Sequence, residues 1–114
     1  MKLSVTSWSF PQCNLAESTG LSKLLGINAI DIGYFYRSAL DKVTLLDDYK
    51  KIIDEISKHD INYPNLYHLF GNSLDDRNLA DINNLEDNKK DLATVTEFCV
   101  EANIPSIFIL PGVT

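Results

Sequence analysis

The chain contains few cysteines, and their placement excludes two classes of small protein. Its 114 residues include only Cys13 and Cys99, which lie far apart and form no CxxC or Cys/His pattern. A disulfide framework and a zinc knuckle are therefore excluded, and the spacing fits a reducing cytoplasm. Cys99 falls on an apolar helical stripe and is expected in the core. Cys13 falls in a predicted loop.

Basic residues and long apolar runs are also scarce. Ten Lys and Arg stand against sixteen Asp and Glu, which gives a net charge of −6. Because affinity for nucleic acids depends on clustered Lys and Arg, we expect no nucleic-acid partner. No apolar run approaches the ~18 residues of a membrane span, and the N-terminus lacks the apolar segment of a signal peptide. The sequence predicts a cytoplasmic protein with no membrane partner.

What the sequence does contain is a regular alternation of apolar strands and amphipathic helices. The first predicted helix places Leu21, Leu24 and Leu25 on one apolar face. A polar stretch over 71–86 is too long for an ordinary connection and is expected to hold a short helical turn. Strands are predicted over 3–9, 29–34, 65–70 and from residue 107, and helices over 16–25, 47–59 and 87–102.

The two later helices carry the clearest periodicity. Asp47 or Asp48 is expected to cap the second helix. Apolar residues at helical spacing are predicted to face the core: Tyr49, Ile52, Ile53 and Ile56 in the second helix, and Leu92, Val95, Cys99 and Ala102 in the third.

The joints from helix to strand repeat one another, which indicates parallel strands joined by right-handed crossovers. Each joint has a helix stop and an Ile beside an Asn: Ile27-Asn28, Ile61-Asn62 and Asn103-Ile104. A doubly wound nucleotide-binding sheet would show a glycine-rich turn after its first strand, and the loop 9–14 contains no glycine. We therefore favour an α/β fold that is part of a (β/α)₈ TIM barrel, with four parallel strands in the order 1-2-3-4.

The last predicted strand, Ile107-Phe108-Ile109-Leu110, lies between two prolines and is apolar throughout. Such a run is typical of a parallel strand covered on both faces. The chain ends where the next helix is expected. We therefore expect residues 1–114 to be the N-terminal half of a TIM-barrel domain, with open sheet edges through which two copies could associate.

Three segments resemble the xylose isomerase-like barrel superfamily, which includes the sugar phosphate isomerases and epimerases. The segments are Leu3-Ser4-Val5-Thr6-Ser7-Trp8-Ser9-Phe10, Gly26-Ile27-Asn28-Ala29-Ile30-Asp31-Ile32 and Ile107-Phe108-Ile109-Leu110-Pro111-Gly112. The resemblance implies proton transfer next to a sugar carbonyl, assisted by a divalent metal (Mg, Mn or Zn). It also implies that most metal ligands come from strands five to eight, so we expect the chain alone to be inactive and assign no metal ligand within it.

Two other functions remain open. One is a metal-dependent phosphodiesterase similar to the apurinic endonucleases of the same superfamily. The excess of acidic over basic residues argues against this function. The other is a non-enzymatic half-barrel that dimerises through its open edges.

Four residues near the expected carboxyl ends of strands are candidates for a carbohydrate site, because barrel enzymes place their sites there. His68 is the catalytic candidate; the alternative is a histidine packed in the core. Trp8, Asp31 and Tyr34 are candidates for substrate contact. A packing role is the alternative for Trp8, and a structural ion pair is the alternative for Asp31.

Overall fold

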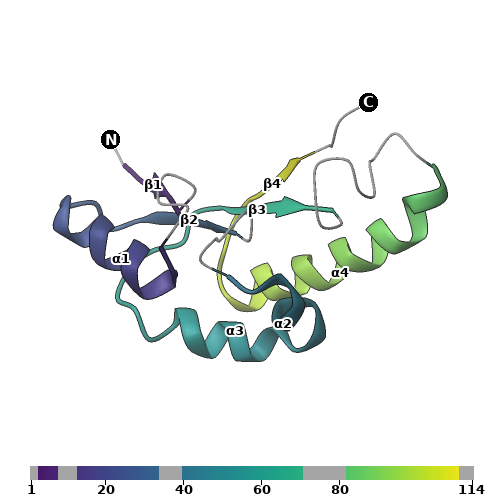
Figure 1. Ribbon diagram of the computed structural model, residues 1–114, viewed down its shortest axis with the longest axis horizontal. Coiled ribbons are helices and arrows are strands. Elements are labelled where there is room, and N and C mark those ends of the chain that lie inside the picture. Colours follow the sequence, from purple (N-terminus) through teal and green to yellow (C-terminus); the bar gives the residue numbers. More distant parts are fainter. Residues whose placement is uncertain (1–2, 8–12, 34–39, 71–81, 111–114) are drawn as a thin grey trace.

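Four short parallel strands form one sheet, with the helices along one of its faces (Figure 1). The computed structural model describes residues 3–7, 13–33, 40–70 and 82–110. The strands pair in chain order: β1 (Val5–Thr6), β2 (Ile30–Gly33), β3 (Leu66–Leu69) and β4 (Ile107–Leu110). The helices are α1 (Leu15–Leu24), α2 (Lys42–Asp47), α3 (Tyr49–Ile56) and α4 (Leu85–Glu101). The predicted α/β fold with strand order 1-2-3-4 is confirmed.

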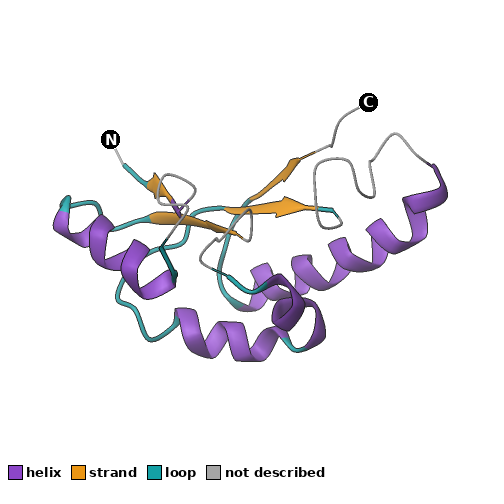
Figure 2. Cartoon of the chain, viewed as in Figure 1, coloured by secondary structure: helices purple, strands orange, loops and turns teal. Residues whose placement is uncertain are grey.

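Figure 2 shows the helices on one side of the sheet, and both the strands and the helices contribute residues to the buried core. From α3 it takes Ile52 and Ile56, with Tyr49 and Ile53 partly buried against it. From α4 it takes Val95, Phe98 and Cys99. The stripe predicted for α3 therefore faces the core. In α4 the predicted Val95, Cys99 and Ala102 do so as well, whereas Leu92 is outside the core cluster and Phe98, which was not predicted, is inside it. Burial raises the pKa of the Cys99 thiol to about 11, which keeps it a neutral apolar side chain.

The repeated joint has the same backbone geometry after α1 and after α4. Gly26 and Asn103 adopt positive φ angles of 77° and 58°, the left-handed conformation that ends many helices. The residue that follows each then donates back into the helix: Ile27 N–H to Ser22 O over 3.0 Å, and Ile104 N–H to Cys99 O over 2.9 Å. The joints therefore direct the chain back to the sheet in the same way.

The predicted core face of α1 is wrong. Leu21, Leu24 and Leu25 are exposed, and the buried residues are Leu15, Ser18, Thr19 and Ser22. The hydroxyl groups enter the core because the backbone satisfies them: Thr19 Oγ1 donates to Leu15 O over 2.9 Å, and Ser22 Oγ donates to Ile27 O over 2.6 Å. The leucine stripe of α1 is left facing outward.

Several predicted boundaries also need correction. The helix predicted over 47–59 starts at Tyr49, and a separate helix, α2, precedes it because the Asp41 side chain accepts the Val43 N–H and Leu45 is buried. A 3₁₀ turn (Ile82–Asn84) leads into α4, two residues earlier than expected. Residues 71–81 lie outside the described ranges. Within those ranges, no helix combines the length and the apolar character needed to cross a membrane.

Candidate functional site

The strands present two different faces, because successive side chains of a strand point to opposite sides. Residues that pair across the parallel sheet share a face, so Ile32 lies beside Leu66, and Gly33 lies beside Tyr67. Ile32 and Leu66 are buried in the core against the helices. Tyr67 and Gly33, together with Asp31, therefore lie on the other face, which the described helices leave uncovered. We call this the helix-free face.

A hydrogen bond links β3 to the residue that follows β1, across the strand β2 that lies between them. Tyr67 Oη in β3 lies 2.6 Å from Ser7 Oγ, just after β1. Both residues are buried, with 3% and 1% of their surface exposed. The tyrosine ring can cross the middle strand because Gly33 has no side chain: a Cβ there would collide with the ring of Tyr67 and with its carbonyl oxygen. The glycine therefore sets the position of the tyrosine hydroxyl.

Asp31 provides the negative charge beside this pair. It is half-buried, and burial raises the pKa of its carboxyl above the ordinary 3.8, while a hydrogen bond with Ser4 lowers it. Burial likewise raises the pKa of Tyr67, the Ser7 hydrogen bond lowers it, and the charge of Asp31 raises it further. Tyr67 is therefore a neutral phenol at pH 7. This face thus gathers two buried hydroxyls that bond to each other and one half-buried carboxylate, groups of the kinds that bond to the hydroxyls of a polar ligand.

His68 is not part of this cluster. It alternates with Tyr67 along β3 and therefore lies on the same face as Leu66, toward the helices. The side chain is fully buried, with its ring at 89° to that of Phe70 and the two centroids 4.5 Å apart. The structure thus brings Asp31 close to Tyr67 and places His68 on the other side of the sheet. Trp8 and Tyr34, the remaining candidates, lie outside the described residues.

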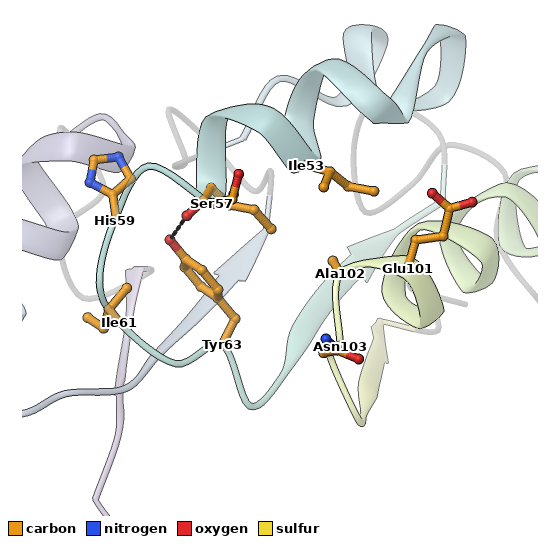
Figure 3. A pocket seen from close by; sticks show the side chains of 9 residues that line it. Ile53, Ser57, His59, Ile61, Tyr63, Glu101, Ala102 and Asn103 are labelled. Carbon is orange, nitrogen blue, oxygen red and sulfur yellow. Dashed lines mark hydrogen bonds between the residues drawn. The ribbon is translucent and has the colours of Figure 1, made fainter.

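A cavity of 270 Å³ opens at the opposite end of the sheet, between the last turns of α3 and α4 (Figure 3). Its walls include Ile53, Tyr63 and Glu101. Tyr63 Oη donates to Ile56 O over 2.8 Å, and burial together with the charge of Glu55 raises the pKa of Tyr63 to about 12. Because this end holds the amino ends of the strands, where parallel barrels carry residues for stability, the cavity is not our candidate for catalysis.

Sequence reasoning missed Ser7 and Tyr67, although one signal pointed to them. A glycine inside a strand often marks a close approach by another group, and Gly33 is such a residue. The partner of Gly33 could not be read from the sequence because it depends on the register between β2 and β3.

Within the described ranges, no group of three or more His, Cys, Asp or Glu residues is placed to hold a metal ion. The described residues alone therefore provide no metal site, and we derive no step through a metal. Comparison of the chain with models of protein families, with curated proteins and with solved structures found no match.

Proposed function

We propose that this chain forms the first half of a (β/α)₈ barrel that binds carbohydrate on its inner surface and belongs to an isomerase or epimerase of the xylose isomerase-like type. One observation carries the proposal: the polar cluster of Ser7, Asp31 and Tyr67 lies on the helix-free face. When a parallel sheet with helices on one side closes into a barrel, its other side becomes the interior. The cluster would then line the barrel.

The chemistry assigned to the described residues is recognition. The Ser7 and Tyr67 hydroxyls already share one hydrogen bond, so as a pair they can donate at most one hydrogen to a sugar hydroxyl; they and the carboxylate of Asp31 can accept from one. Because the resemblance places most ligands of a divalent metal on strands five to eight, we expect the 114-residue chain to bind sugar without turning it over. The reduced cysteines, Cys13 and Cys99, fit a cytoplasmic enzyme.

Binding can be tested by titrating the ¹⁵N-labelled chain with D-fructose and with its 6-phosphate. We expect amide shifts at Ser7, Gly33 and Tyr67, and none at the amides around Tyr63. Tyr67→Phe removes the hydroxyl from the cluster and should weaken binding about fivefold, the worth of one hydrogen bond of about 1 kcal/mol. Tyr63→Phe is the matched control, because it removes a buried hydroxyl that bonds to Ile56 O at the other end of the sheet.

Two outcomes would contradict the proposal. One is the absence of shifts with both sugars at millimolar concentration. The other is equal weakening by the two tyrosine variants, which would point to lost stability instead of a lost contact. Turnover by the chain with added Mg²⁺ or Mn²⁺, followed as solvent exchange of the proton next to the carbonyl, would show that the metal ligands lie within these 114 residues.

A further inference from the structure

The walls of the cavity between α3 and α4 come from two short segments of the chain. Residues between 53 and 63 provide the end of α3 and the link to β3, and residues 101–103 provide the end of α4 (Figure 3). Strands β1 and β4, beyond which a barrel would continue, are not among the described residues that line it. The cavity is therefore defined without reference to the carbohydrate site or to further strands.

One part of the wall is apolar and large enough for a ring. Ile53, Ile56, Ile61 and Ala102 provide aliphatic side chains, and Tyr63 adds an aromatic one. The Tyr63 hydroxyl donates to Ile56 O, so this polar atom is satisfied within the chain. An apolar cavity of about 150 Å³ holds a benzene molecule. The 270 Å³ of this cavity therefore suit one ring with a short side chain.

Two helices end at the cavity, and both bring negative charge to it. The last turn of a helix carries a partial negative charge, which a basic residue there often offsets. Neither α3 nor α4 has a basic residue in its last turn. Instead, Glu55 lies in the last turn of α3, and Glu101 is the last residue of α4. The carboxylates thus add to the helix dipoles at the place where a cation is favoured.

The negative charge acts on Tyr63 in the wall and on Tyr49 of α3. Burial raises the pKa of Tyr63 to about 12, and the charge of Glu55 contributes to that rise. A hydrogen bond to Glu101 raises the pKa of Tyr49, with a further rise from burial and from the charges of Glu101 and Glu97. In this hydrogen bond Tyr49 Oη donates to Glu101 Oε1 over 2.9 Å. The bond ties Glu101, which lines the cavity, to α3.

An organic cation matches this wall better than a metal ion does. The described residues that line the cavity include no lysine or arginine. His59 lies at the opposite end of the wall from Glu101, with its Nδ1 3.4 Å from Thr19 Oγ1 of α1 (Figure 3). No three His, Cys, Asp or Glu residues in the described ranges are placed to hold a metal. A ring can instead pack on the isoleucines while an attached ammonium group faces Glu101.

We propose that this cavity binds a small organic ammonium, a single ring that carries a primary amine on a short chain. The ring lies against Ile53, Ile56 and Tyr63, and the ammonium group lies at Glu101 beside the carbonyl end of α4. The site is at the opposite end of the sheet from the cluster of Ser7, Asp31 and Tyr67. It is therefore a second site, and it holds whether or not the carbohydrate proposal does.

Titration of the ¹⁵N-labelled chain with phenethylamine, a cation at pH ~7, tests the site. We expect amide shifts at Ser57, Ala102 and Asn103, with a dissociation constant on the order of a millimolar for a ligand of so few atoms. Phenethyl alcohol has the same ring without the charge and should bind about threefold more weakly. Hydrocinnamate carries the opposite charge, and methylammonium carries the charge without the ring. Neither should bind.

Two glutamate variants test the position of the charge. Glu101→Gln removes the charge, while its amide oxygen can still accept from Tyr49. It should weaken phenethylamine about threefold and leave phenethyl alcohol unchanged. Glu86→Gln is the matched control, because it removes the same charge from the first turn of the same helix. This position is about 22 Å away along the helix, beyond the screening length of about 8 Å at physiological salt, so both ligands should bind as before.

Several results would overturn the proposal. They are the absence of phenethylamine shifts at these three amides, equal binding of the amine and the alcohol, and equal effects of the two glutamate variants. Shifts that spread to the amides around Glu86 would show a general attraction to the net charge of −6 and would also overturn it. The carbohydrate proposal is read at Ser7, Gly33 and Tyr67, so either proposal can fail while the other stands.

Discussion

Gly33 is the residue on which the geometry of the candidate site depends. A methyl group at this position would meet the ring and the backbone of Tyr67. Because part of the obstacle is backbone, we expect Gly33→Ala to lower the free energy of unfolding by about 1–3 kcal/mol and to weaken the Ser7–Tyr67 bond. Gly20, in α1, has nothing within 4 Å of the corresponding Cβ. Gly20→Ala should therefore stabilise the chain by about 0.5–1 kcal/mol through helix propensity. Urea unfolding of the two variants measures both changes in the free energy of unfolding. A Gly33→Ala variant as stable as the parent chain would contradict the close approach of Tyr67.

Asp31 should make stability depend on pH in an identifiable direction. Its pKa in the folded chain is raised by burial above 3.8, so the fold favours the protonated carboxyl. The stability that this proton confers is fully present below the unfolded pKa and is lost as pH rises through the folded pKa. Asp31→Asn stays neutral throughout.

The measurement is the difference in unfolding free energy between the parent chain and Asp31→Asn, from pH ~3 to pH ~7. We expect the parent chain to lose stability relative to the variant as pH rises. Ser4→Ala is a second test, because the hydrogen bond from Ser4 lowers the pKa of Asp31. Without this hydrogen bond, the loss of stability with rising pH should occur at higher pH. A difference that stays constant across this range would refute the raised pKa.

At the level of single residues, the sequence predicted Asp31 but not its partner. The strand from Asn65 to Phe70 is apolar on both faces, so no alternation shows which residues meet the helices. His68 and Tyr67 are adjacent in this run, and the pairing with β2 and β4 decides which of them joins the polar cluster. Sequence reasoning selected His68 for its chemistry, whereas the register places Tyr67 beside Gly33.

Among the elements, α1 carries the best defined helix start. Asn14 accepts the Glu17 N–H over 2.9 Å, and the Glu17 side chain accepts the Asn14 N–H over 3.1 Å, which completes a capping box. We expect Asn14→Ala to cost about 1 kcal/mol of unfolding free energy. Asp48 holds the same position before α3 without a side-chain hydrogen bond, so Asp48→Ala should cost less. Thermal or urea unfolding compares the two, and the reverse order would contradict the capping geometry.

Elements were predictable where one local signal determined them. The strands β2, β3 and β4 follow from apolar runs, and the core faces of α3 and α4 follow from helical spacing. The six-residue α2 was missed because it is too short to show a period. In α1 the period was real but its leucines face outward, because the side of a helix that meets the sheet is set by tertiary packing.

At the scale of the whole sheet, the helices lie on one face, and within the described residues no strand pairs with the outer edge of β1 or of β4, so stability should reflect whether these edges are closed. If the folded state is a dimer, unfolding separates two chains, and mass action makes the dimer more stable at higher concentration. Each tenfold increase in concentration should add about 1.4 kcal/mol per mole of dimer to the apparent stability, so the thermal midpoint should rise with concentration.

The leucines of α1 provide the control for this effect. Leu24 is 84% exposed within one chain, so Leu24→Asp has little to lose there; if this end of α1 is covered in a dimer, the variant should lower the midpoint and move its rise to higher concentration. Val43→Asp, on α2, should keep the dependence of the parent chain. Differential scanning calorimetry over a hundredfold range of concentration would separate the two variants. A midpoint of the parent chain that is independent of concentration would mean that the open edges of this sheet do not bind a second copy.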